Sequence, residues 1–125
     1  AGSGGRVEVG AEPQYCLIDP DELGFVLDNL IGNAIRAMDG ARVRNLGITW
    51  SVIDGMLMTD VSDTGCGIDP EDHERILDTR YTSREGGGHG LPRSRKILRK
   101  YGGSLVVHTS EPGRGSTLRL SLPLA

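Results

Sequence analysis

Polar side chains recur along one stripe of a predicted helix, and their chemistry suits a metal ion and phosphate. Asn29, Asn33 and Arg36 stand at spacings of four and seven residues, which places all three on one helix face. An amide oxygen is a good ligand for a hard cation, and arginine pairs with phosphate. Asparagine is a weak helix former, so the stripe indicates a ligand site. The alternative is an ordinary solvated helix face.

A carboxylate followed by two glycines forms a second candidate site. In SDTGCGID, residues 62–69, Asp63 ends a predicted strand, and Gly65 and Gly67 follow it. Glycines at this spacing let the backbone turn tightly and approach a flat ligand. The carboxylate can accept a hydrogen bond from an exocyclic amine. Turns of the form Asp-x-Gly are also common without any ligand.

A glycine-rich run before a basic helix forms a third candidate. In GGGHGLPRSRKILRKYGG, residues 86–103, Gly86, Gly88 and Gly90 alternate ahead of Pro92. Backbone N–H groups at a helix N-terminus attract phosphate. Nearby arginines add positive charge: Arg84, Arg93 and Arg95. No Gly-Lys-Ser/Thr follows, so this is not a P-loop, and a plain loop is the alternative reading.

Helices and strands that would position these sites follow from periodicity and turn residues. A short strand is expected at 14–18, and then a helix capped by Asp19, with Pro20 first and Glu22 three residues on, running to about Met38. Asp54-Gly55 predicts a hairpin between strands 46–53 and 56–62. A short helix is expected from Pro70 to about Leu77, a loop over 78–90, and a second long helix from Pro92 to Gly102.

The last two predicted strands complete the sheet. Strands at 104–109 and 116–122 flank EPGRG, and Leu118, Leu120 and Leu122 alternate with polar residues, which indicates one buried face. We therefore expect an α+β fold, a two-layer sandwich. A mixed, mostly antiparallel sheet would be covered on one face by about three helices.

Composition narrows the class of protein. The chain has 125 residues, enough for one domain over residues 6–125, and residues 1–5 read as a linker. The net charge of −3 argues against nucleic-acid binding and against direct contact with an anionic membrane. Cys16 and Cys66 have no metal-ligand or disulfide spacing, so we expect a reducing, cytoplasmic location. A parent protein with a membrane anchor elsewhere remains compatible with this.

Taken in order, these motifs resemble the catalytic and ATP-binding domain of sensor histidine kinases, in the GHKL superfamily of the Bergerat fold. The stretch LDNLIGNAIRAM resembles the family's asparagine box, and DTGCGI matches its first glycine box. ILDTRYTSREGGGHGL is similar to the lid and second glycine box, and GRGSTLRLSLP to the final hairpin strand. The resemblance runs from about residue 14 to 123. It departs from the family at the lid, which lacks the usual phenylalanines, and at His89 and Pro92.

The resemblance implies a role for each matching residue. Asn33 would hold the magnesium ion that bridges the ATP phosphates, and Asp63 would receive the adenine amino group. Ser116 or Thr117 resembles the hydroxyl residue near the adenine. The residues that would act as catalytic groups at the phosphates are Asn29, Arg36 and Arg84. The residues implied to bind ATP are Asn29, Asn33, Arg36, Asp63, Gly65, Gly67, Ile68, Tyr81, Thr82, Arg84, Gly86, Gly88, His89, Gly90, Leu91 and Thr117.

Asn29 also bears on the reaction. Hydrolytic members of the superfamily place glutamate one turn before the magnesium asparagine to activate water, whereas this chain has asparagine there. Phosphoryl transfer depends mainly on positioning and charge neutralisation. A site without a base can therefore keep the γ-phosphoryl group for another acceptor. The resemblance implies a protein-histidine kinase that uses ATP and Mg²⁺.

The acceptor is expected on a separate dimerisation domain. His73, on a predicted surface helix, and His108, in a predicted strand, do not match a phosphoacceptor motif. From the acceptor histidine the group would pass to an aspartate on a response regulator receiver domain. One alternative is an anti-sigma-type serine kinase of the same fold. Another is a degenerate, non-catalytic adaptor that binds nucleotide weakly or docks partners.

Overall fold

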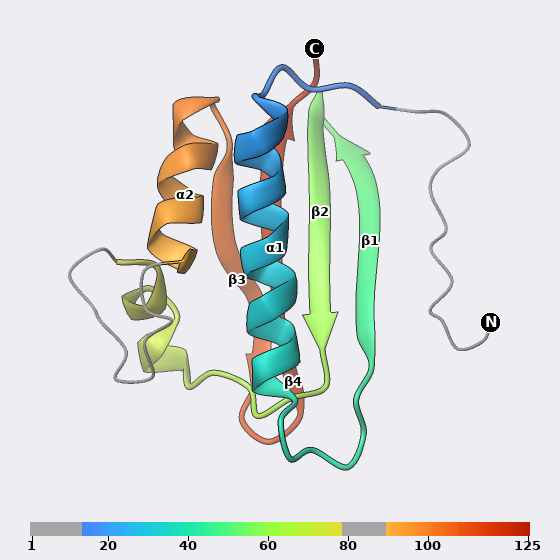
Figure 1. Ribbon diagram of the computed structural model, residues 1–125, viewed down its shortest axis with the longest axis vertical. Coiled ribbons are helices and arrows are strands. Elements are labelled where there is room, and N and C mark those ends of the chain that lie inside the picture. The colour runs from blue at the N-terminus through green and yellow to red at the C-terminus, as the bar shows by residue number, and fades with distance from the viewer. Residues whose placement is uncertain (1–13, 79–89) are drawn as a thin grey trace.

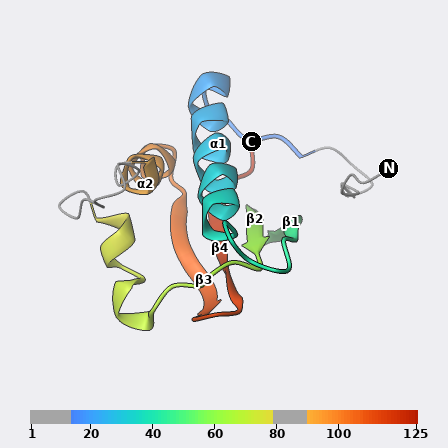
Figure 2. The same ribbon diagram turned by 60° about the horizontal axis from the view of Figure 1, so that its bottom comes forward.

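Two α-helices lie on one side of a four-stranded sheet. The computed structural model describes residues 14–78 and 90–125. Figures 1 and 2 show α1 (Pro20–Ala37) and α2 (Gly90–Lys100) on the same side of the sheet. The strands are β1 (Leu46–Ile53), β2 (Met56–Asp63), β3 (Ser104–Glu111) and β4 (Gly115–Pro123). They pair antiparallel in the order β1-β2-β4-β3. The predicted two-layer α+β sandwich is confirmed, and its described strands are all antiparallel.

The first helix begins where the sequence predicts. The Asp19 side chain accepts hydrogen bonds from the backbone N–H of Asp21 at 2.8 Å and of Glu22 at 3.2 Å, and Pro20 is the first helical residue. The Glu22 carboxylate, however, does not return to Asp19. It accepts a hydrogen bond from Lys100 Nζ at 2.6 Å and another from the Tyr101 hydroxyl. Glu22 therefore joins the start of α1 to the end of α2.

The core lies between the helices and the sheet. Leu118, Leu120 and Leu122 of β4 are all at most 2% exposed, which confirms the predicted buried face. Alternate residues of β2 face the same side. The buried hydrophobic cluster consists of Val26, Leu30, Ala34, Val61, Leu77, Leu91, Leu98, Leu105, Leu118, Leu120 and Leu122.

The predicted hairpin at Asp54-Gly55 is confirmed. Asp54 has φ 52° and Gly55 has φ 77°, the left-handed pair that a two-residue hairpin turn requires. Ile53 and Met56 pair directly beside the turn. The register that follows brings the end of β2, Asp63, opposite Leu46 on one side and Ser116 on the other.

Some predicted boundaries were wrong. Residues 14–18 form no strand, because Cys16 makes only an isolated bridge to Leu124 near the chain end. The helix predicted from Pro70 is two 3-10 helices, η1 (Pro70–Asp72) and η2 (Arg75–Leu77). Helix α2 starts at Gly90, two residues before Pro92, which is possible because the first turn of a helix needs no proline N–H. Of the loop predicted at 78–90, residues 79–89 lie outside the described residues.

Candidate functional site

Asn29, at one end of the polar stripe of α1, lies against the start of α2. Asn29 and Asn33 are half-buried and Arg36 is exposed. The Asn29 amide donates a hydrogen bond from Nδ2 to the Phe25 carbonyl at 2.8 Å, which fixes the side chain. Within residues 14–78 and 90–125 the Asn33 side chain has no hydrogen bond. Its amide is therefore available to a ligand.

Gly90 brings the third predicted site onto the first. A Cβ atom added to Gly90 would stand 1.9 Å from Asn29 Oδ1, so only glycine permits this approach. The N-terminus of α2, where N–H groups lack intrahelical partners and the helix dipole is positive, thus lies directly beside Asn29. Leu91, also predicted to bind ATP, places its side chain in the hydrophobic core, and its contact with ATP stays a prediction.

Asp63 is held at the end of β2 by groups on both sides. The residue is 6% exposed. Its Oδ1 accepts a hydrogen bond from the Gly65 N–H at 2.8 Å, and its Oδ2 accepts one from Ser116 Oγ at 3.1 Å. Each carboxylate oxygen has two lone pairs, so both contacts leave capacity for a ligand amine.

The two glycines of DTGCGI are required by packing as well as by any ligand. A Cβ on Gly65 would lie 2.3 Å from the Ala37 carbonyl oxygen, and one on Gly67 would lie 2.2 Å from that of Glu111. Gly67 also has φ +77°. The loop is therefore pressed against the end of α1 on one side and the β3–β4 hairpin on the other.

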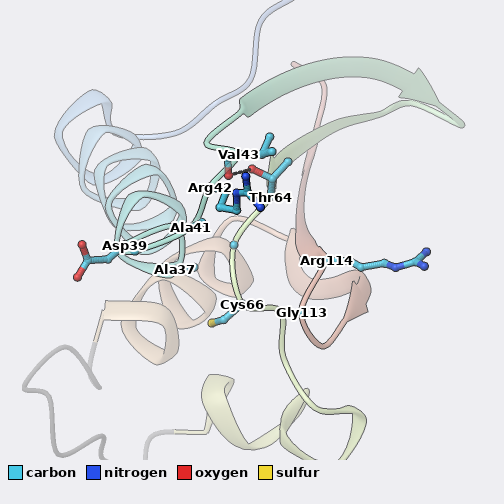
Figure 3. A pocket seen from close by; sticks show the side chains of 11 residues that line it. Ala37, Asp39, Ala41, Arg42, Val43, Thr64, Cys66, Gly113 and Arg114 are labelled. Carbon is cyan, nitrogen blue, oxygen red and sulfur yellow. Dashed lines mark hydrogen bonds between the residues drawn. The ribbon is translucent and has the colours of Figure 1, made fainter.

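Backbone and side-chain hydrogen bonds tie this loop to its neighbours. Cys66 N–H donates to the Ala37 carbonyl at 3.0 Å, and the Cys66 carbonyl accepts from Gly113 N–H at 2.7 Å. The Thr64 hydroxyl donates to the Val43 carbonyl at 2.7 Å. Thr64 and Cys66 line a pocket of ≈ 690 Å³, and Figure 3 shows them between the α1–β1 connection and the β3–β4 turn. Helix α1 and the hairpin together determine the shape of the loop.

The sheet register separates the two candidate hydroxyls. Ser116 lies opposite Asp63 and bonds to it, while Thr117 lies opposite Ser62, and their hydroxyls are 2.8 Å apart. Side chains alternate across a strand, so Thr117 points to the sheet face away from the helices. Ser116 is therefore the hydroxyl residue that contacts Asp63, and binding of ATP by Thr117 stays a prediction.

Sequence reasoning missed Ser110. Its hydroxyl oxygen accepts a hydrogen bond from the Ile68 N–H at 2.6 Å, so it contacts the last residue of the glycine box. Leu105 and Val107 alternate toward the core, and continuing that alternation would turn Ser110 outward. Ser110 points inward because β3 has an irregularity between Val107 and Thr109. No pattern in the sequence predicts this irregularity.

The arginines near α2 are engaged with protein groups. Arg93 lies over the Phe25 ring, with its guanidinium carbon 4.6 Å from the ring centroid. Arg95 pairs with Glu74 at 3.2 Å. The remaining predicted residues lie outside the described residues: Tyr81, Thr82, Arg84, Gly86, Gly88 and His89.

Two carboxylates with lowered pKa values, Asp60 and Glu22, lie away from this site. Two hydrogen bonds from Arg119, at 2.7 and 2.9 Å, lower the pKa of Asp60 on the open sheet face. Hydrogen bonds from Lys100 and Tyr101 lower the pKa of Glu22. Both carboxylates serve to join elements of the fold.

A magnesium ion at the polar stripe would be bound by amide oxygens, because the stripe has no carboxylate. Among residues 14–78 and 90–125, no three His, Cys, Asp or Glu side chains gather where they could hold a metal ion. Mg²⁺ at phosphates commonly takes only one or two protein oxygens, so the unbonded Asn33 amide fits such an ion. Within the same part of the chain, neither helix is long and apolar enough to cross a membrane.

Known proteins share both sequence and fold with this chain. The sensor protein FixL of Bradyrhizobium diazoefficiens is 35% identical over 111 residues, which cover 87% of this chain and 22% of FixL. The signal transduction histidine-protein kinase AtoS of Escherichia coli is 36% identical over 107 residues, covering 85% and 17%. The chain thus spans about a fifth of the length of these relatives.

Solved structures, among them the catalytic domain of a histidine kinase, have the same fold. Full-length ShkA in complex with AMPPNP superposes with a TM-score of 0.78 at 29% identity, covering 90% of this chain and 24% of ShkA. The nucleotide-free catalytic domain of the histidine kinase ThkA gives a TM-score of 0.73 at 28% identity, covering 85% and 69%. Residues 18–125 match the family described as histidine kinase-, DNA gyrase B-, and HSP90-like ATPase. Because this match takes in most of the chain, the chain belongs to that ATPase family.

Proposed function

We propose that this chain is the ATP-binding catalytic domain of a two-component sensor histidine kinase. It would bind Mg-ATP along α1 and donate the γ-phosphoryl group to a histidine on a separate dimerisation domain. A response regulator receiver domain would then take the group from that histidine. Since ATP is the substrate, we place the domain in the cytoplasm.

One observation carries the proposal: a single face of α1 connects the two candidate sites. Asn29 meets Gly90 at the start of α2, and Ala37, two turns further along, meets Gly65 of the glycine box. Eight residues of helix span about 12 Å. One end of this face offers Asp63 with free lone pairs, suited to an amine on a base. The other offers amides and a helix N-terminus, suited to phosphates.

Bound Mg²⁺ would neutralise charge on the phosphates, with Asn33 as its protein ligand. The chain's own groups would hold the nucleotide. Asn29, whose amide is neutral and bonded to the helix backbone, cannot remove a proton from water. This supports transfer to a protein acceptor over hydrolysis.

Titration with a fluorescent ATP analogue, with Mg²⁺ and with EDTA, tests the binding step. We expect Mg²⁺-dependent binding that weakens about tenfold or more in Asn33→Ala and Asp63→Asn, since hydrogen bonds to charged groups contribute about 1.5–3 kcal/mol. Asn45→Ala and Asp28→Asn, exposed residues of the same types, are matched controls and should bind as the native chain does. Binding that ignores Mg²⁺ and both site substitutions would refute the proposal.

The fate of the phosphoryl group separates the kinase from its alternatives. Mixed with its native dimerisation domain and labelled ATP, the chain should produce acid-labile phosphohistidine. Acid-stable phosphoserine on a partner would identify a serine kinase instead. Nucleotide binding without transfer to any partner would identify a non-catalytic adaptor.

A further inference from the structure

Ser110, on a strand far from the glycine box in sequence, holds that box in place. We infer that Ser110 is a positioning residue for the nucleotide base, an inference that rests on the proposed function. Its hydroxyl accepts the Ile68 N–H at 2.6 Å and can donate onward to the Gly115 carbonyl at 3.4 Å. A hydroxyl has one donor and two acceptor sites, so both contacts are compatible.

A row of side chains across three strands supports both ends of the box. Asp63 of β2 lies opposite Ser116 of β4, and Ser116 lies opposite Ser110 of β3. Ser116 bonds to Asp63, where the box begins, and Ser110 bonds to Ile68, where it ends. The loop between them leaves the sheet at β2 and returns to it at the edge strand β3. Two serines of one hairpin thus fix the position of the whole loop.

A β-bulge gives Ser110 this orientation. In β3, Val107 pairs with Leu118 on the core side, and Thr109 pairs with Thr117 on the open side, so His108 is the extra residue. In a regular strand without the bulge, the alternation that places Leu105 and Val107 inward would place Thr109 inward and Ser110 outward. Bulges commonly re-aim a side chain beside a functional site.

Close backbone contacts show that the hairpin and the box are fitted to each other. A Cβ on Gly115 would stand 2.1 Å from the Asp63 carbonyl oxygen, as one on Gly67 would from Glu111 at 2.2 Å. Gly113 N–H bonds to the Cys66 carbonyl. Among these contacts the bond from Ile68 to Ser110 is made by a side chain, so it can be removed without changing the backbone.

Substitution of Ser110 should weaken the binding of Mg-ATP because the residues that contact the nucleotide base would no longer be held in place. In Ser110→Ala we expect Mg-ATP to bind about three- to tenfold more weakly, the effect of leaving one half-buried N–H without its partner. The preference for Mg-ATP over Mg-GTP should narrow, because Asp63 and Ile68 would no longer be held at a fixed spacing. Hydrogen exchange at the Ile68 amide should accelerate.

Matched variants separate positioning from general destabilisation. Ser110→Thr keeps the hydroxyl and should restore affinity, base preference and Ile68 protection. Ser104→Ala removes a hydroxyl from the other end of β3, where it contacts Ser121 at 2.6 Å, and should bind nucleotide as the native chain does. A loss in Ser110→Ala that Ser110→Thr does not restore, or that Ser104→Ala reproduces, would overturn the inference.

The result also distinguishes this inference from the proposed function. If the native chain binds Mg-ATP and Ser110→Ala binds it equally well with unchanged base preference, the positioning role is wrong and the function stands. If the native chain binds no Mg-ATP, the proposed function is wrong and the role of Ser110 in base recognition is wrong with it.

Discussion

Replacing Gly90 with alanine probes the contact between α2 and the polar stripe of α1. The new Cβ would stand 1.9 Å from Asn29 Oδ1, about 1.5 Å closer than an ordinary van der Waals contact of 3.4 Å. Gly90 has no left-handed φ, so the cost is steric and not conformational. Either Asn29 rotates or the start of α2 moves away.

The two consequences for stability nearly cancel. Rotation of Asn29 would break its 2.8 Å bond to the Phe25 carbonyl, at a cost of about 1 kcal/mol. Alanine favours a helix over glycine by up to about 1 kcal/mol. We therefore expect the free energy of unfolding to change by less than about 1 kcal/mol. Mg-ATP affinity should fall about ten- to hundredfold, because hydrogen bonds from this stripe to charged phosphates contribute about 1.5–3 kcal/mol.

Urea unfolding and fluorescent-nucleotide titration measure these two quantities separately. Gly24→Ala on α1 is the matched control, since a Cβ there meets nothing within 4 Å. It should stabilise the chain by up to about 1 kcal/mol and leave affinity unchanged. A double-mutant cycle with Asn29→Ala then tests the cause.

The cycle has a clear refuting result. If the clash with Asn29 weakens binding, Asn29→Ala with Gly90→Ala should bind no worse than Asn29→Ala alone. Additive losses in the double variant, or native affinity in Gly90→Ala, would show that this contact does not control the site.

Two further predictions concern the hairpin and the open sheet face. Gly67→Ala and Gly113→Ala both place alanine at positive φ, but of the two only Gly67 approaches another carbonyl, at 2.2 Å. We expect Gly113→Ala to lose about 1–2 kcal/mol in urea unfolding from its backbone conformation alone. Gly67→Ala should lose more than Gly113→Ala, because its Cβ also clashes, and should lose nucleotide affinity as well; equal losses of stability in the two variants would contradict the packing role of Gly67. Because Arg119 lowers the pKa of Asp60, the pair should stabilise the fold above about pH 4, the ordinary Asp pKa, and lose that stabilisation as pH falls through the lowered value. Asp60→Asn should then cost about 1 kcal/mol at pH 7 and progressively less in urea unfolding below pH 4; a difference constant down to pH 3 would contradict this linkage.

Local signals predicted most of the fold. The Asp19 cap with Pro20, and the Asp54-Gly55 turn, each specify a backbone conformation within a few residues, so their elements were predicted correctly. Segment 14–18 has strand-like residues, but among the described residues its strand pairing is limited to the bridge between Cys16 and Leu124. Whether a strand forms there depends on tertiary neighbours, which the residues of the segment do not encode.

Some residues of the candidate site could likewise be predicted from local sequence, and others depend on pairing between distant strands. Asn29, Asn33 and Asp63 follow from spacing along one helix and from a strand end, and the structure places the first two on one helical face. Thr117 and Ser110 depend on sheet register and on a bulge, where a shift of one residue turns every side chain to the other face. Register arises from pairing between distant strands, so the sequence near Thr117 could not distinguish it from Ser116.

Helix α2 is attached to α1 at both of its ends. The ion pair from Lys100 and the hydroxyl of Tyr101 meet Glu22 at one end, and Gly90 abuts Asn29 at the other. A tilt of α2 away from α1 would have to break the first attachment or vacate the second. The two helices should therefore move together, and a hinge that moves them relative to another domain would have to lie before Pro20 or after Tyr101.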